Sequence, residues 1–252
     1  MADKGNVTEP STLAPLAAAL AGHGMLIRGG FRLSDEDEHG LAGFPDLAST
    51  LRDRTLVLIG NAGRPLYDAF FKADESVGDN PLDGWTRRML APIATAFGAR
   101  AAFPSDGPPW LPFQRWAMRA EGLRASPLGV LIHPEYGLWH AYRAALVFDR
   151  PIDLPVSPRA DHPCDTCIAR PCLTSCPVGA VTAAGYAVDN CAKHVSSADG
   201  MACRSFGCLA RRACPVGSDY QYPERAMAFH MAAFLRGRGL PISHPEGSSA
   251  VQ

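Results

Sequence analysis

All the cysteines of this chain lie in one stretch, and their spacing is the strongest chemical signal in the sequence. Thiolates are soft donors, the ligands that zinc and iron–sulfur clusters take from proteins. Eight of them are present, the number that two [4Fe–4S] clusters need. They are Cys164, Cys167, Cys172, Cys176, Cys191, Cys203, Cys208 and Cys214. Their confinement to one stretch indicates a single metal-binding region.

The spacing divides these cysteines into two sets. The first four read C-x2-C-x4-C-x3-C-P, close to the C-x2-C-x2-C-x3-C-P of bacterial two-cluster ferredoxins, in which the last cysteine binds the other cluster. A second Cys-Pro pair at Cys214 indicates a looser second copy, with Arg211 where a ligand might have been expected. This exchange predicts one [4Fe–4S] cluster on Cys164, Cys167, Cys172 and Cys214, and another on Cys176, Cys191, Cys203 and Cys208.

Three other interpretations of the cysteines compete with this one. C-x2-C is also a zinc-binding spacing, but zinc does not account for the four-cysteine run with its terminal proline. Disulfides suit small secreted domains, whereas this chain has 252 residues. Inert core cysteines would not gather in one segment. The iron–sulfur interpretation is therefore favoured.

Composition bounds the class of protein. With 47% hydrophobic and 19% charged residues, the chain can bury the core of one large or two modest domains. Its net charge of −1 provides no overall positive field that would attract nucleic acid. Nucleic acid is therefore not expected as a partner. Residues 12–22 are predicted to form a folded helix rather than a signal peptide, and no stretch approaches the ~20 apolar residues of a membrane span. Reduced thiolates then predict a cytoplasmic protein without a membrane partner.

Hydrophobic patterning and end signals predict an alternation of strands and helices. The run Thr55–Ile59 is continuously apolar, as in a strand covered on both faces. A second apolar segment, residues 129–148, reads as two strands around a bend made by Pro134 and Gly137. Arg143 within it needs an anionic or acceptor partner if it is buried. Strands are also expected at 24–33 and 99–103, and helices from 65, 80, about 113 and 224.

Residues 129–148, GVLIHPEYGLWHAYRAALVF, with the following Ile152-Asp-Leu-Pro155, resemble the core of the CblC family of cobalamin-processing proteins. That family has an H-P-x-[FY]-G-x-W-x-A-x-R run. The resemblance implies a corrinoid pocket and carries over five candidate cofactor-binding residues: His133, Tyr136, Gly137, Trp139 and Arg143. The cysteine region resembles the ferredoxin domain of epoxyqueuosine reductases and respiratory reductive dehalogenases, which join a similar corrin-binding domain to two [4Fe–4S] clusters.

Together the resemblances imply an α+β fold, a nitroreductase-like (CblC-type) domain followed by a ferredoxin-like di-cluster domain. The expected bounds are 1–150 for the corrinoid-binding domain, 151–222 for the cluster domain, and 223–252 for a C-terminal helix and flexible tail. Two departures matter. Nothing after Ser218 is long enough for the helical tRNA-binding repeat of epoxyqueuosine reductases, and no Asp-x-His-x-x-Gly run supplies a lower axial histidine.

The function predicted from these features is reductive processing of cobalamin, an oxidoreductase activity like that of cobalamin reductases or decyanases. The clusters would pass single electrons from a donor protein to the cobalt, and no side chain is nominated as a catalytic acid or base. Two alternatives stay open: a ferredoxin-type electron carrier without cobalamin, and a cobalamin chaperone without turnover. A flavin in place of the corrin is also conceivable, although no Gly-rich phosphate fingerprint favours it.

Overall fold

The computed structural model describes residues 13–34, 37, 54–75, 78–154 and 161–241. The tail from residue 242, most of the acidic loop at 35–38 and part of the proline-rich linker lie outside these ranges. The described elements confirm a mixed α+β protein. The nitroreductase-like and ferredoxin-like assignments remain predictions.

The chain divides into two compact, discontinuous units. The first comprises Met1–Asn61, Asp68–Gly122 and Ala141–Pro158, and the second comprises Ala62–Tyr67, Leu123–His140 and Arg159–Gln252. The HPEYGLWH segment at 133–140 therefore belongs to the same unit as the cysteines. The expected domain bounds at 150 and 222 remain predictions about domains and differ from this division.

The first unit is built on a four-stranded sheet of order β1-β2-β6-β3. β1 pairs antiparallel with β2, and β3 pairs antiparallel with β6. β2 is buried at all eight positions, as its continuous apolar run predicts, because both of its faces are covered. The strands are β1 (Leu26–Arg32), β2 (Thr55–Ala62), β3 (Ala99–Ala102) and β6 (His140–Phe148).

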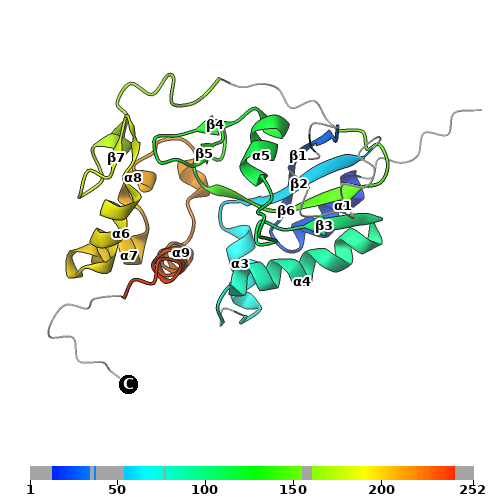
Figure 1. Ribbon diagram of the computed structural model, residues 1–252, viewed down its shortest axis with the longest axis horizontal. Helices are drawn as coiled ribbons and strands as arrows, with labels where there is room; N and C mark the ends of the chain where they lie inside the picture. The colour runs from blue at the N-terminus through cyan, green and yellow to red at the C-terminus, as the bar shows by residue number, and fades with distance from the viewer. Residues whose placement is uncertain (1–12, 35–36, 38–53, 76–77, 155–160, 242–252) are drawn as a thin grey trace, which may run out of the picture. The chain divides into compact units, whose positions relative to one another are not determined.

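Helices cover this sheet (Figure 1). α4 packs against β3, α5 and α1 pack against β1, and α1 also contacts α4. The buried stripe of α4 runs through Leu82, Trp85 and Leu90, as the helical spacing of its apolar residues predicts. The bounds are α1 (Leu13–Ala21), α3 (Pro65–Lys72), α4 (Pro81–Ala96) and α5 (Phe113–Glu121).

A buried ion pair joins β1 to the end of α5. Arg28, only 3% exposed, donates from Nε and Nη2 to the two carboxylate oxygens of Glu121, each at 2.9 Å. The Tyr142 hydroxyl on β6 also donates to Glu121. Burial is the main reason why the pKa of Tyr142 lies above its ordinary value; Arg28 opposes the shift and Glu121 adds to it. The Tyr142 hydroxyl therefore stays neutral in the folded protein, because a buried phenolate beside the Glu121 carboxylate would be unfavourable.

Tyr142 is expected to make the protein less stable in alkali. Above pH ~10 the unfolded chain ionises this tyrosine while the folded protein keeps it neutral, so the folded state binds more protons and the free energy of unfolding falls with pH. The slope for one proton is about 1.4 kcal/mol per pH unit. Tyr142→Phe should remove that component in chemical denaturation between pH 9 and 11. An unchanged alkaline slope in the variant would contradict this assignment.

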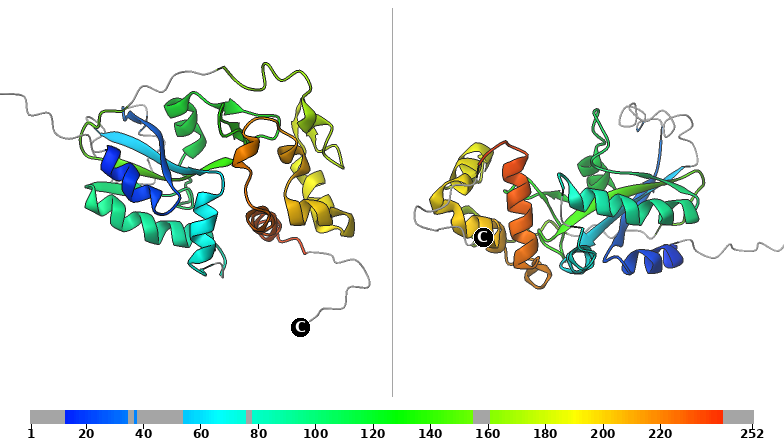
Figure 2. Two further views of the ribbon diagram at one scale, coloured as in Figure 1. Left: turned by 180° about the vertical axis from the view of Figure 1, so that it is seen from behind. Right: turned by 90° about the horizontal axis from the view of Figure 1, so that it is seen from below.

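The second unit consists of short elements around the cysteines. α9 packs along α7 and also contacts α6, as the two views of Figure 2 show. The longer helices are α6 (Val188–Ser196), α7 (Met201–Phe206), α8 (Leu209–Arg212) and α9 (Glu224–Arg236). The short strands and turns are β4 (Arg124–Ala125), β5 (Leu131–Ile132), η2 (Pro171–Leu173), β7 (Val181–Thr182), β8 (Gly185–Tyr186), η3 (Ala198–Gly200) and η4 (Ser218–Tyr220).

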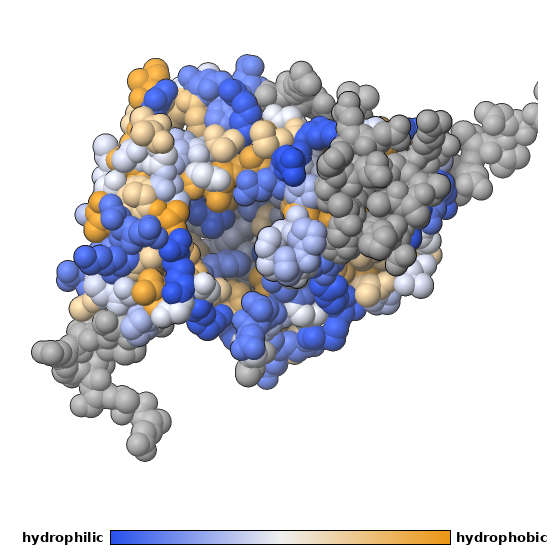
Figure 3. All heavy atoms as spheres, viewed as in Figure 1, coloured by the Kyte–Doolittle hydropathy of each residue, from blue (hydrophilic) through white to orange (hydrophobic). Residues whose placement is uncertain are grey.

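Hydrophobic and hydrophilic residues are interspersed on the face shown in Figure 3. Exposed apolar side chains such as Ile168, Met201 and Phe206 are present in the second unit. Single exposed apolar residues of this kind are normal on protein surfaces. Among the described helices, none has the length and apolar character needed to cross a bilayer.

Candidate metal centre

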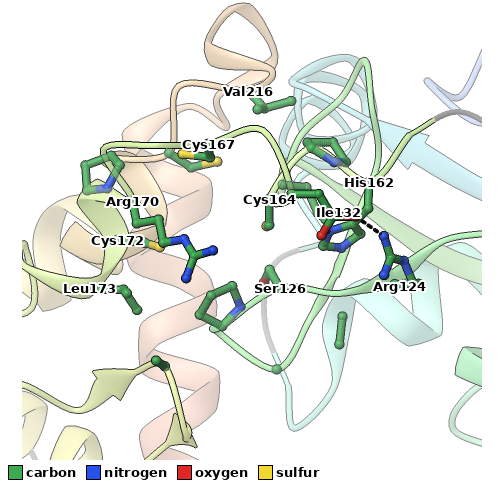
Figure 4. Close-up of a pocket in the computed structure, with 18 of the residues that line it drawn as sticks. Arg124, Ser126, Ile132, His162, Cys164, Cys167, Arg170, Cys172, Leu173 and Val216 are labelled. Atoms are coloured by element: carbon green, nitrogen blue, oxygen red, sulfur yellow. Dashed lines mark hydrogen bonds and ion pairs between the residues drawn. The ribbon is translucent and has the colours of Figure 1, made fainter.

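Three neighbouring cysteines and one that is distant in sequence line one cavity of the second unit. The cavity has a volume of about 490 Å³, and its wall includes Cys164, Cys167, Cys172 and Cys214. Figure 4 labels the first three. Burial raises the pKa of Cys164, and the nearby sulfurs of Cys214, Cys172 and Cys167 raise it further. The four thiols are therefore close enough to repel one another as thiolates, which is the arrangement that a shared cationic centre relieves.

The other four cysteines line a second, smaller space. Its volume is about 20 Å³, and Cys176, Cys191, Cys203 and Cys208 all contribute to it. Cys191 lies on α6 and Cys203 on α7, and both are buried. The sequence pattern did not predict these helices, because the irregular second spacing gives no loop signature. The helices bring together sulfurs that a single loop would not reach.

The structure thus groups the eight cysteines as the spacing predicts. Four soft donors around each space fit a cluster that is held by one thiolate per iron. Within the described ranges, no three Cys, His, Asp or Glu side chains converge closely enough to hold a single metal ion. The cluster assignment remains a prediction, and the grouping of the sulfurs supports it.

Two glycines hold the Cys214 loop against the HPEYG turn. Gly137 has a φ of +56°, and a Cβ atom there would lie 2.6 Å from the carbonyl carbon of Val216 and closer still to its oxygen. Gly217 has a φ of +71°, and its Cβ would lie 2.5 Å from the backbone nitrogen of Gly137. Both positions need glycine for conformation and for space. Gly137 of the HPEYG turn therefore lets the backbone at Val216, two residues after Cys214, pack closely against the turn.

Arg211 makes a second link between the same segments. Its Nε donates to the carbonyl oxygen of Leu138 at 3.1 Å. Its guanidinium lies 4.4 Å from the centroid of the Trp139 ring and 4.8 Å from that of Tyr222. Arg211 thus occupies the position of an expected ligand and links the chain between Cys208 and Cys214 to the Leu138 carbonyl and the Trp139 ring. Sequence reasoning noted the position and missed this role.

The ring of His133 is oriented by its own turn. Its Nδ1 accepts hydrogen bonds from the backbone N–H groups of Glu135 and Tyr136, both at 3.1 Å. A neutral ring that accepts at Nδ1 carries its proton on Nε2, which makes Nε2 a donor and not a metal ligand. The ring also stacks on Tyr136, with centroids 4.2 Å apart and planes at 11°. His133 and Tyr136 thus lie together at the turn.

Trp139 and Arg143, the other two corrinoid candidates with large side chains, have partners of their own. Trp139 is completely buried, and its ring packs against Tyr222 as well as Arg211. Arg143 lies on β6 in the first unit, where its Nε donates to Oδ1 of Asn61 at 2.9 Å. Arg143 has the acceptor partner that its place in an apolar strand requires. The role of all five residues toward a corrinoid stays a prediction.

No family model and no curated protein matches this chain. The solved structures that resemble it include epoxyqueuosine reductases from Bacillus subtilis (TM-score 0.47, 16% identity) and Streptococcus thermophilus (TM-score 0.44, 16% identity). Another is an epoxyqueuosine reductase with an epoxyqueuosine-modified tRNA-Tyr stem loop (TM-score 0.47, 15% identity). Each alignment covers 84% of this chain and 66% of the other.

The expectation that nucleic acid is not a partner has to be corrected. One of these structures was solved with a tRNA stem loop. The expectation rested on the net charge of −1, which is the sum over two units with different balances of basic and acidic residues. In the second unit Arg and Lys outnumber Asp and Glu. The charge of the whole chain therefore does not exclude a nucleic acid.

Gly137→Ala is expected to displace the Cys214 loop. The added methyl group meets backbone atoms, which cannot move aside as a flexible side chain can, and a non-glycine residue at this φ costs a further ~1–2 kcal/mol. The loss in free energy of unfolding should be about 3 kcal/mol or more. Iron bound per chain after anaerobic purification should fall as well.

Gly98→Ala is the matched control for this prediction. Gly98 has a φ of +67°, and a Cβ atom there would have no neighbour within 4 Å. The control variant should therefore lose only the conformational part, about 1–2 kcal/mol, and should keep its iron. Equal losses of stability and iron in the two variants would show that the contact with Val216 does not matter.

Proposed function

We propose that this protein is an iron–sulfur oxidoreductase in which each set of four cysteines holds one [4Fe–4S] cluster. The observation that carries the proposal is that the two sets, partitioned by spacing, line two separate spaces in the structure. A zinc ion would need ligands converging at about 2.3 Å on one point. A cubane needs sulfurs spread around a larger body, which the cavity of the first set favours.

The chain's own groups prepare both sites for anionic sulfur. Burial raises the pKa of Cys208 and Cys214, and backbone groups oppose the rise: Arg211 and Ala210 at Cys208, and Val216 at Cys214. The Ala180 amide donates to Cys176 Sγ at 3.3 Å. Bound clusters would supply one-electron transfer at low potential. The protein fixes the ligands, donates these hydrogen bonds and limits the access of water.

The acceptor that we propose for these electrons is the cobalt of a corrinoid. The support is the resemblance of residues 129–148 to the CblC core, together with the aromatic group at the HPEYG turn. His133 and Tyr136 are stacked and half-buried, and Tyr220 packs edge-on against Tyr136 with centroids 4.9 Å apart. Aromatic rings of this kind favour contact with a flat macrocycle.

A modified nucleoside in tRNA is a second candidate substrate. The observation in its favour is the excess of basic over acidic residues in the second unit, because phosphate contacts by Arg and Lys dominate the affinity of proteins for nucleic acids. A tRNA anticodon stem loop should then bind with an affinity that falls steeply as salt is raised. Fluorescence anisotropy at two salt concentrations measures this.

The decisive experiment for the favoured function is a hydroxocobalamin titration of the anaerobically purified holo-protein. We expect the corrinoid spectrum to change on binding, and the bound cobalt to be reduced when the clusters have first been reduced chemically. Iron and zinc are measured on the same sample. Zinc without iron would contradict every redox form of the proposal.

The other outcomes separate the alternatives. Clusters with no spectral response to corrinoid would indicate an electron carrier. Corrinoid binding without reduction by reduced clusters would indicate a chaperone. Binding of the tRNA stem loop without any corrinoid response would favour the nucleoside as substrate with another cofactor.

A further inference from the structure

The charged side chains around the two cysteine sets differ. Arg170 lies between Cys167 and Cys172 and lines the first cavity. Figure 4 shows its guanidinium extending into the space beside Cys172. Arg170 therefore brings a positive charge beside the Cys172 sulfur. In the described part of the chain, no carboxylate pairs with Arg170.

The other charges at the first cavity largely cancel. Arg124 lies on its wall and forms an ion pair with Asp165. Asp165 also faces His162, whose Nδ1 lies 3.6 Å from a carboxylate oxygen. Arg170 is thus the one cation of this wall that is not matched by a carboxylate among the described residues. The charged side chains on the wall of the first cavity therefore sum to a net positive charge.

Among the described residues, no arginine or lysine lines the second space, and His194 is the one basic side chain on its wall. The cation that acts on Cys191 is Arg238, and its Nη1 lies 2.9 Å from Oδ1 of Asp189. Most of the other residues around the second space are apolar, among them Val195, Leu209 and Met231. The partly buried Tyr186 packs against the group that contains Cys191 and Cys203, and it brings no full charge. A full charge acts over a longer range than a hydroxyl dipole.

The difference in solvent exposure also favours a higher reduction potential at the first set. All four cysteines of the first set are half-buried, whereas Cys191 and Cys203 of the second are buried. Reduction adds negative charge to a centre that is already anionic. A nearby cation and water both stabilise that charge, and both raise the reduction potential of a cluster.

Resting on the proposed function, we infer that the two clusters differ in reduction potential and that the unpaired guanidinium of Arg170 makes the first site the one reduced first. A single electron from an external one-electron donor then resides on the cluster held by Cys164, Cys167, Cys172 and Cys214. The second cluster accepts an electron only at lower potential. Arg170 is a positioning residue in this sense, because it determines where the electron rests and binds no iron.

The test is an EPR-monitored redox titration of the holo-protein with its full complement of iron. Wild type should show two reduction steps. Arg170→Gln should shift the higher potential to a more negative value, leave the lower one in place and keep the same iron content. Arg170→Lys keeps the charge and should stay close to wild type. The shift should shrink at high salt, because Arg170 is exposed and its field is screened.

Arg238→Gln is the matched control at the second set. It should leave the higher potential unchanged, because that potential belongs to the other cluster, and should move the lower one little, because Asp189 already neutralises Arg238. Coincident potentials in wild type would overturn the inference, and so would an Arg170→Gln variant in which the higher potential does not move. Either result leaves the iron–sulfur proposal intact. An absence of iron would instead remove the proposed function itself.

Discussion

The second unit depends on the close approach of two backbone segments. They leave no room for a side chain at the point where they meet. The HPEYG turn and the Pro215–Gly217 segment touch through Gly137 and Gly217, both in the left-handed region. Cys214, which is separated from Cys172 by 41 intervening residues of sequence, reaches the first cavity only if the chain after it is fixed. The glycine contact fixes it, and Arg211 adds a hydrogen bond and ring contacts to the same pair of segments.

This arrangement gives the HPEYGLWH motif a role that does not require a cofactor. Gly137 provides the close approach, Trp139 provides a buried surface for Arg211, and the carbonyl oxygen of Leu138 accepts the hydrogen bond. His133 and Tyr136 are left half-buried at the turn. The motif is thus divided in the structure: part of it supports the cysteine loop, and the pair His133 and Tyr136 carries the proposed contact with a corrinoid.

The sequence allowed much of the framework to be predicted. The apolar run at Thr55, the stripe of α4 and the start of α9 at Glu224 follow local rules of patterning and helix ends, and the structure contains all three. The partition of the cysteines followed from the chemistry of cluster ligation. The pairing of Arg28 with Glu121 could not be predicted, because the two residues are separated by 92 others and no local pattern links them. The role of Arg211 was hidden for the same reason.

Local sequence patterns also do not reveal which compact unit contains the 133–140 segment. The predicted boundary at residue 150 includes the segment in the first domain, whereas the compact unit that contains it also contains the cysteines. A strand that begins in one unit and continues in the other leaves no compositional break to detect. The mistaken exclusion of nucleic acid had a similar origin, because one net charge was applied to two units of unequal charge.

The central claim is that two independent sets of four cysteines hold two clusters, with Cys214 completing the first and Cys208 the second. The most direct measurement is Mössbauer and iron analysis of anaerobically purified Cys214→Ser and Cys208→Ser proteins. Wild type should hold about eight iron atoms per chain, and each variant should keep one intact [4Fe–4S] cluster while the other is altered or lost. Only Cys214→Ser should perturb the cluster next to Arg170. Loss of both clusters in each variant, or a wild-type protein with zinc in their place, would contradict the account.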